Sequence, residues 1–168
     1  MTVTLRPGQP TDAGKIGDIL HRFETDTSWM PKEHSGAEAI SFCGTMIDRG
    51  WVTVAERAQQ ILGFLARDGD EICALYVAPE AQGQGIGSAL LNEAMTQVVQ
   101  IMLWTFQVNV GAQRFYLRHG FVETTRTDGQ GNAENLSDIA YVWTKVAPAL
   151  ADGSEPVGEA HREKEHGA

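Results

Sequence analysis

The chain has 168 residues, of which 42% are hydrophobic and 21% charged, and its formal net charge is −9 at pH 7. This length suits one well-cored domain, and the acidic balance argues against a nucleic-acid or anionic-membrane partner, because both require a basic patch. The N-terminus lacks the features of a signal peptide, and no apolar run approaches the ~18 residues of a membrane span, so we expect a cytoplasmic protein. Cys43 and Cys73 form neither a disulfide framework nor a metal-binding pattern, and we expect two buried thiols and no metal site.

The first part of the chain predicts a strand, a helix and a loop. Residues 3–6 alternate as a strand, and Thr11 or Asp12 can cap the helix that follows. The core-facing stripe of this helix consists of Ile16, Ile19, Leu20 and Phe23. Residues 25–34 show no periodicity and contain a proline, which predicts a surface loop between two helices.

A second helix and three strands come next. Ser35 and Glu38 form a capping-box pattern, and Gly50 ends the helix that begins there. Its apolar stripe consists of Ile40, Cys43 and Ile47. Three alternating or apolar segments around short turns then predict an antiparallel meander of strands at 51–56, 61–67 and 71–77.

A glycine-rich turn joins the third of these strands to a helix. Pro79 stops the strand, and helical spacing of apolar residues runs from Ile86 to about Val99. Gly83, Gly85 and Gly87 lie between the two elements at alternate positions. Glycines placed in this way expose backbone N–H groups and let an anion approach the main chain, while the helix dipole favours negative charge. The pattern therefore predicts a phosphate-binding loop.

Two common phosphate loops are excluded by spacing. A Walker loop needs a lysine after its last glycine, whereas Gly87 is followed by Ser88. The dinucleotide pattern G-x-G-x-x-G fails as well, because its last position holds Ser88 when read from Gly83 and Leu90 when read from Gly85.

The remaining chain alternates strands and one helix. Residues 101–108 predict a buried strand parallel to 71–77, because a helix connects the two. Asn109 begins a helix that ends at Gly120, with a stripe of Ala112, Phe115, Tyr116 and His119. Strands at 121–126 and 139–146 enclose a polar loop at 128–137. We expect a domain over residues 1–147 and a charged tail over 148–168.

Both motifs resemble signatures of the GNAT superfamily of N-acetyltransferases. Gln82, Gly85 and Gly87 fill its acetyl-CoA pattern Gln/Arg-x-x-Gly-x-Gly/Ala, and Leu75-Tyr76-Val77 with Pro79 fill the flank. The segment from Asn109 through Phe115-Tyr116 to Gly120-Phe121 resembles the second signature, and together the two halves cover residues 3–146. Trp29-Met30-Pro31 also resembles an uncharacterised bacterial subgroup, which names no substrate.

The resemblance implies a fold and a cofactor. The fold would be a mixed α/β (α+β) architecture, in which six to seven mostly antiparallel strands are flanked by about four helices and the fourth and fifth strands splay apart. Acetyl-CoA would be the co-substrate. Its pantetheine arm would contact the backbone of Tyr76 and Val77, with the pyrophosphate at Gln82, Gly83, Gln84, Gly85, Ile86, Gly87 and Ser88. Asn109 and Phe115 would flank the arm.

Amine acetylation also requires proton transfer. An alkylammonium group with a pKa of about 10.4 must lose a proton before it attacks, and Glu71 matches the acidic position that many relatives carry on this strand. His34 and Glu24 are the alternatives. Tyr116 matches the position that protonates the departing thiolate, and the N–H of Val77 is a candidate oxyanion donor. An acyl-enzyme at Cys73 is not required.

Acceptor recognition is assigned to the loops at 25–34 and 128–137. Trp29, Met30 and His34 are the candidate substrate-binding residues, although Trp29 and Met30 equally suit a small core under the loop. We expect an acetyltransferase acting on a small-molecule or amino-acid-like amine, with no nucleic-acid or membrane partner. One alternative is a protein acetyltransferase that acts on an N-terminal or lysine amine, and the other is a non-catalytic CoA sensor. The sequence is also compatible with a homodimer.

Overall fold

The computed structural model describes residues 2–146. Over this range the chain forms a mixed seven-stranded sheet in the order β1-β2-β3-β4-β5-β7-β6, with β4 and β5 parallel, and four α-helices. The strands are β1 (Thr4–Pro7), β2 (Val52–Arg57), β3 (Gln60–Asp68), β4 (Glu71–Val77), β5 (Gln100–Phe106), β6 (Val122–Thr127) and β7 (Asp138–Thr144). The helices are α1 (Ala13–Asp26), α2 (Gly36–Asp48), α3 (Ile86–Gln97) and α4 (Val110–Arg118). The expected fold class is confirmed, whereas the tail expected at 148–168 lies outside the described residues.

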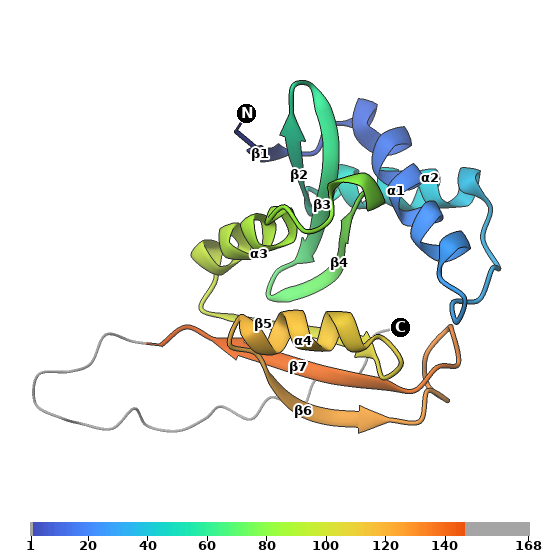
Figure 1. Cartoon of the computed structure of the whole chain (residues 1–168), viewed down its shortest axis with the longest axis vertical. Helices are drawn as coiled ribbons and strands as arrows, with labels where there is room; N and C mark the ends of the chain where they lie inside the picture. The colour runs from blue at the N-terminus through green and yellow to red at the C-terminus, as the bar shows by residue number, and fades with distance from the viewer. Residues whose placement is uncertain (1, 147–168) are drawn as a thin grey trace, which may run out of the picture. The chain divides into compact units, whose positions relative to one another are not determined.

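The described chain divides into two compact units, an N-terminal one that ends at Leu103 and a C-terminal one that begins at Trp104. In the N-terminal unit, α1 and α2 lie on one side of the β2–β3–β4 meander and α3 lies on the other (Figure 1). The stripes predicted for α1 and α3 supply buried residues between these layers, including Ile16, Ile19, Leu20, Ile86, Leu90 and Leu91. The meander and the parallel direction of β5 are as predicted, and Glu71 stands opposite Met102 in that parallel pair. The splay expected further along the pair stays a prediction.

The capping box of α2 is confirmed, but its predicted stripe is partly wrong. Ser35 Oγ accepts a hydrogen bond from the N–H of Glu38, and the Glu38 carboxylate accepts one from the N–H of Ser35. Ile40 is 40% exposed, whereas the buried side of the helix consists of Ala39, Cys43, Met46 and Ile47. The buried side of α2 is therefore rotated by about one residue from the predicted stripe, and Ile40 lies at the edge of this buried side.

Cys43 is buried as expected, whereas Cys73 is exposed, so the second prediction is wrong. The reason lies in the register of β3 and β4. Ala66 pairs with Ala74 but Arg67 pairs with Ile72, so Cys73 is the additional residue of a β-bulge. A bulge interrupts the alternation of sides along a strand, and the alternating pattern of the sequence gives no sign of it.

The C-terminal unit packs α4 and strands β6 and β7 around aromatic side chains. The Tyr116 ring contacts Phe121 at 5.3 Å and Tyr141 at 6.5 Å between centroids, and all three residues are buried.

Buried polar side chains hold the 128–137 loop. Asp138 accepts hydrogen bonds from the hydroxyl of Thr127 and from Asn132 Nδ2, the latter at 3.1 Å. This loop is therefore fixed at its base by a hydrogen-bonded carboxylate.

Asp12 does not cap α1 with its side chain. Its carboxylate instead accepts two hydrogen bonds from the Arg6 guanidinium, at 2.8 and 3.1 Å, and one from the N–H of Gln9 at 2.7 Å. Arg6 also pairs with Glu56 at 2.9 Å. Asp12 is 6% exposed, so these bonds tie β1 to the start of α1 in a site with little water. The hydrogen bond from Arg6 is the main cause that lowers the pKa of Asp12 below its usual value.

We expect Asp12→Ala to lower the free energy of unfolding by about 2 kcal/mol near neutral pH, because it leaves buried donors without their acceptor. The lowered pKa means that the unfolded chain binds this proton more tightly than the folded protein. The contribution of Asp12 is thus complete above a pH of about 4 and is lost as the pH falls further. Urea unfolding from neutral to acid pH measures it.

Asp18→Asn is the matched control. Asp18 lies on α1 with a 61% exposed side chain and pairs with Arg22 four residues later, an arrangement that contributes about 0.5 kcal/mol or less. Equal losses from Asp12→Ala and Asp18→Asn would contradict the structural role of Asp12.

Candidate active site

The glycine-rich loop lies between β4 and α3 and follows a short 3₁₀ helix, η2 (Pro79–Ala81). Gly83 and Gly85 adopt left-handed backbone angles, with φ of +76° and +81°, and both are exposed. Apart from the glycine itself and its two chain neighbours, no described residue has a heavy atom within 4 Å of the position that a Cβ would occupy at Gly83 or Gly85. Gly85 is the N-cap of α3 and offers no side-chain hydrogen bond to the first turn. The loop thus combines open space over its main chain with helix N-terminal amides that receive no N-cap side chain.

The two glutamines of the loop fasten it to neighbouring segments. Gln82 Nε2 donates to the carbonyl of Val77 at 3.3 Å, which connects the loop to the end of β4. Gln84 Oε1 accepts a hydrogen bond from Arg57 Nη1 at 2.9 Å. Their side chains are therefore directed at protein groups, and the glycines between and beside them remain open. This arrangement fits an anion such as a pyrophosphate, which binds to main-chain N–H groups.

Arg57 is a residue of this site that the sequence analysis missed. It ends β2, and the two following residues, Ala58 and Gln59, have φ of +52° and +65° in a tight hairpin turn. Only the pairing of β2 with β3 brings this turn to a loop 27 residues further along the chain. No local pattern in the sequence carries that information.

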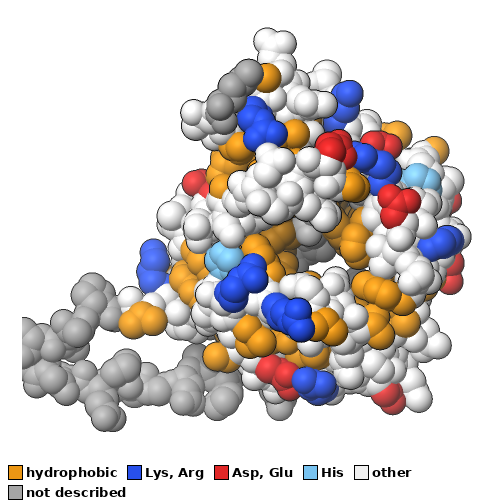
Figure 2. Space-filling view, viewed as in Figure 1, with side chains coloured by type: hydrophobic (Ala, Val, Ile, Leu, Met, Phe, Trp, Pro, Cys, Tyr) orange, Lys and Arg blue, Asp and Glu red, His pale blue; other side chains and the backbone are white. Residues whose placement is uncertain are grey.

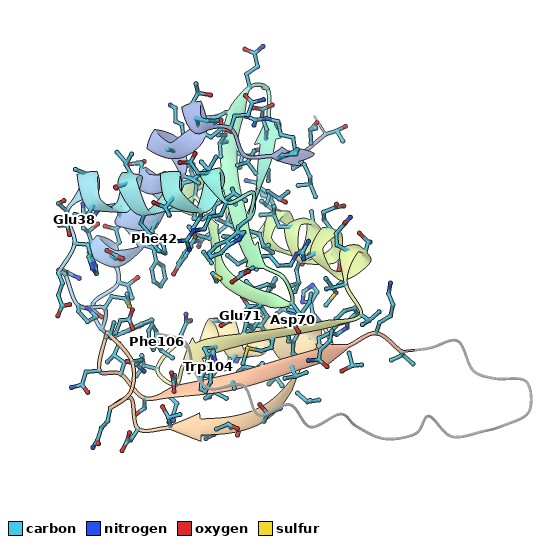
Figure 3. All side chains as sticks on the ribbon, turned by 180° about the vertical axis from the view of Figure 1, so that it is seen from behind. Glu38, Phe42, Asp70, Glu71, Trp104 and Phe106 are labelled. Carbon is cyan, nitrogen blue, oxygen red and sulfur yellow. The ribbon has the colours of Figure 1, made fainter. Side chains whose placement is uncertain are left out.

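Glu71 is the first residue of β4 and lies next to Asp70 at the turn from β3 (Figure 3). Its side chain is half-buried. Val77 ends the same strand, six residues later. At a rise of about 3.3 Å per residue, the two positions lie ~20 Å apart along the strand.

The alternative bases also lie in the N-terminal unit. His34 Nδ1 is 4.0 Å from Glu24 Oε2, and their side chains are 56% and 13% exposed. Glu24 Oε2 accepts no hydrogen bond from the described residues.

Burial, with a smaller effect from the charge of Glu24, raises the pKa of Cys43 to about 11, so this thiol stays protonated near neutral pH.

Aromatic contacts connect the 25–34 loop with β4. Trp29 meets Phe23 edge-on at 6.0 Å, and Phe23 packs against Tyr76 at 5.0 Å between ring centroids. Met30 is 9% exposed, whereas Trp29 is half-buried and His34 exposed. Met30 therefore belongs to a small core under the loop, and Trp29 and His34 are the side chains of this set that reach the surface.

Asn109, Phe115 and Tyr116 belong to the C-terminal unit. Asn109 caps α4, because its Oδ1 accepts a hydrogen bond from the N–H of Ala112 at 3.1 Å. Phe115 packs against the rings of Tyr116 and His119, with centroids 5.2 and 4.5 Å apart. Tyr116 is 8% exposed. The second motif thus has a clear structural role in forming and packing α4.

A separate hollow of about 210 Å³ lies in the N-terminal unit. Its lining includes Trp51 and Arg67 beside the C-terminal half of α3, where Glu93 and Gln97 face it. It is therefore at the end of α3 remote from Gly85 and does not form part of the glycine-rich loop.

Among the described residues there is no group of three or more His, Cys, Asp or Glu side chains that could hold a metal ion, and no helix has the length and apolar character needed to cross a membrane.

Comparisons with known proteins find GNAT acetyltransferases that are similar to part of this chain. Residues 48–123 match the family model described as an acetyltransferase (GNAT) domain. The peptidyl-lysine N-acetyltransferase YjaB of Escherichia coli K12 is 33% identical over 94 residues, which span 55% of this chain and 63% of YjaB, less than two thirds of its length. The matched part of the chain is therefore similar to GNAT acetyltransferases, in agreement with the resemblance of the two motifs.

Solved structures share the fold at low sequence identity. The solution structure of apo-YjaB from Escherichia coli has a TM-score of 0.72 at 19% identity and covers 87% of this chain and 100% of its own. The structure of yncA from Salmonella typhimurium, which contains its cofactor acetyl-CoA, has a TM-score of 0.68 at 19% identity and covers 92% and 100%. These neighbours confirm the fold class.

Proposed function

We propose that this chain is an acetyl-CoA-dependent N-acetyltransferase that transfers the acetyl group directly to a primary amine. The observation that carries the proposal is the open loop of left-handed glycines between β4 and the uncapped first turn of α3. The backbone of residues 82–88 would hold the pyrophosphate of CoA, and backbone groups of Tyr76 and Val77 would hold the pantetheine arm. Bound acetyl-CoA supplies a thioester carbonyl that a free amine can attack.

Glu71 is the proposed general base. It would accept the proton of the ammonium group, whose pKa of about 10.4 keeps most of it charged at neutral pH. The ~20 Å between Glu71 and Val77 means that both cannot contact one reacting carbonyl. We therefore assign Val77 to the arm alone and not to the oxyanion. An arm that runs from the loop back along β4 would direct the thioester toward Glu71.

Residues of α4 complete the proposal. Tyr116 would protonate the departing thiolate, since a phenol with a pKa near 10 can donate to a thiolate whose conjugate acid has a pKa near 8.5. Asn109 and Phe115 would flank the arm. Because the N-cap bond uses the Asn109 amide oxygen, its contact with the cofactor would come from the amide nitrogen.

The proposed acceptor is the primary amine of a small molecule or an amino-acid-like compound, next to Trp29 and His34. Peptidyl lysine is the second candidate, because the similar YjaB is named a peptidyl-lysine N-acetyltransferase. Incubation with acetyl-CoA and a panel of free amines, amino acids and lysine-containing peptides, with thiol release and product mass as readouts, separates the two. Binding of acetyl-CoA without acetylation of any acceptor would favour a CoA-binding sensor.

We expect CoA to stabilise the folded protein. A ligand that binds only the folded state adds about 2.7 kcal/mol at a hundredfold excess over its Kd. Thermal unfolding should therefore shift upward with CoA, and much less with NAD or ATP at the same concentration. Equal shifts from all three compounds would contradict the assignment of CoA.

A further inference from the structure

The cofactor loop has a cationic side chain beside it that comes from another part of the sheet. Arg57 Nη1 donates to Gln84 Oε1 at 2.9 Å, across the gap between the β2–β3 hairpin and the loop. The hairpin turn at Ala58 and Gln59 contains only two residues between the paired Arg57 and Gln60, which fixes the backbone from which the arginine extends. A short turn and a specific hydrogen bond together place this guanidinium at the loop.

The position of the Arg57 guanidinium matters because the loop itself has no positively charged side chain. Residues 82–88 contain no charged side chain, and the whole chain carries a formal charge of −9. The acidic residue just before the loop, Glu80, is paired with Arg22 at 3.0 Å, and this hydrogen bond lowers the pKa of Glu80. Arg22 is also paired with Asp18. Acidic and basic side chains accordingly lie next to one another over α1 in Figure 2.

Arg57 differs from Arg22 because it donates to a neutral amide, whereas Arg22 pairs with carboxylates. The guanidinium has five N–H donors, and the bond to Gln84 uses one of them. Its positive charge is not matched by Gln84, and the remaining donors suit a phosphate oxygen, for which the planar guanidinium can provide two parallel hydrogen bonds. The glycine loop itself offers backbone amides, the helix dipole and uncharged side chains, and none of its residues carries a positive charge.

We propose that Arg57 is a cofactor-binding residue whose guanidinium pairs with a phosphate group of CoA beside the glycine-rich loop, and that Gln84 orients it. The inference rests on the proposed function, because it assumes that CoA occupies this loop. Arg57 supplies the positive charge that the loop lacks, and it comes from the β2–β3 hairpin outside both sequence motifs. The phosphate is either part of the pyrophosphate or the 3′-phosphate, which share the same chemistry.

Titration calorimetry with CoA and with dephospho-CoA, at low and at high salt, tests this role. We expect Arg57→Gln to weaken CoA binding about tenfold at low salt, the size of one charge-assisted hydrogen bond, and less at high salt. Arg57→Lys should lose less affinity because it keeps the charge. A loss confined to CoA identifies the 3′-phosphate, and an equal loss for both ligands identifies the pyrophosphate.

Arg67→Gln is the matched control. Arg67 is also half-buried and also donates to an uncharged oxygen, the carbonyl of Gly69, but it lies at the opposite end of β3 from the hairpin. We expect this variant to bind both ligands as the parent does. Circular dichroism and thermal unfolding confirm that the variants are folded.

Two results would overturn the role of Arg57. One is an Arg57→Gln protein that binds both ligands as tightly as the parent. The other is a loss of equal size at low and high salt, which would show that Arg57 merely fastens the hairpin to the loop. A parent protein that binds neither ligand would instead refute the proposed function, and with it this inference.

Discussion

Gly85→Val is expected to abolish CoA binding while the protein still folds. The residue needs a φ of +81° and caps α3, and a valine there carries its branched Cβ into the open space over the loop. A bulky β-branched side chain at that point would occupy the place of the phosphate. It would also strain a left-handed backbone, at a cost of about 1–3 kcal/mol. Calorimetry with CoA and circular dichroism measure binding and folding separately.

Gly50→Val separates backbone strain from loss of the binding site. Gly50 has a φ of +76° and, like Gly85, no described heavy atom within 4 Å of its Cβ position, but it follows the end of α2. The two variants should lose similar stability, and only Gly85→Val should lose CoA. Asparagine tolerates the left-handed region, so Gly85→Asn tests the added side chain with less strain. Full CoA affinity in a folded Gly85→Val protein would show that the glycine serves packing alone.

Glu71→Gln is expected to lower kcat/KM by roughly a hundredfold near neutral pH, the usual contribution of a general base. Glutamine keeps the size of the side chain but cannot accept the proton of the ammonium group. The defect should shrink as the pH rises toward the pKa of the amine, about 10.4, because the free base then forms without help. CoA affinity should change little. Steady-state kinetics between about pH 6 and 9, with calorimetry for CoA, provide the measurement.

Asp68→Asn is the control for Glu71→Gln. Asp68 is an exposed carboxylate that pairs with Glu71 in the register of β3 and β4. Its replacement removes a charge from the same turn without removing the proposed base, so activity should stay close to that of the parent. Parent-like activity of Glu71→Gln across this pH range would place the base elsewhere. Glu24 and His34 would then be the next residues to replace, because they lie within 4.0 Å of each other in the same unit.

Local sequence patterns specify the elements and motifs that depend on neighbouring residues. The β4 strand runs from Glu71 to Val77 as predicted, and α3 begins directly after Gly85. The capping box at Ser35 and the cap of α4 at Asn109 also form where local spacing predicts them. The hydrogen bonds of the two caps join groups at most a few residues apart, so the local order of residue types is sufficient to specify them. Strand β4 is marked in the sequence by its apolar residues between a turn signal and Pro79.

Tertiary structure alone decided the features that depend on distant partners. The β-bulge that exposes Cys73 arises from the register between β3 and β4, and the carboxylate of Asp12 turns to Arg6 instead of capping α1. Arg57 reaches Gln84 because the pairing of β2 with β3 brings their hairpin to the loop. A bulge and a pairing between side chains of different elements depend on the partner segment as well, so the residues next to them in the sequence do not specify them.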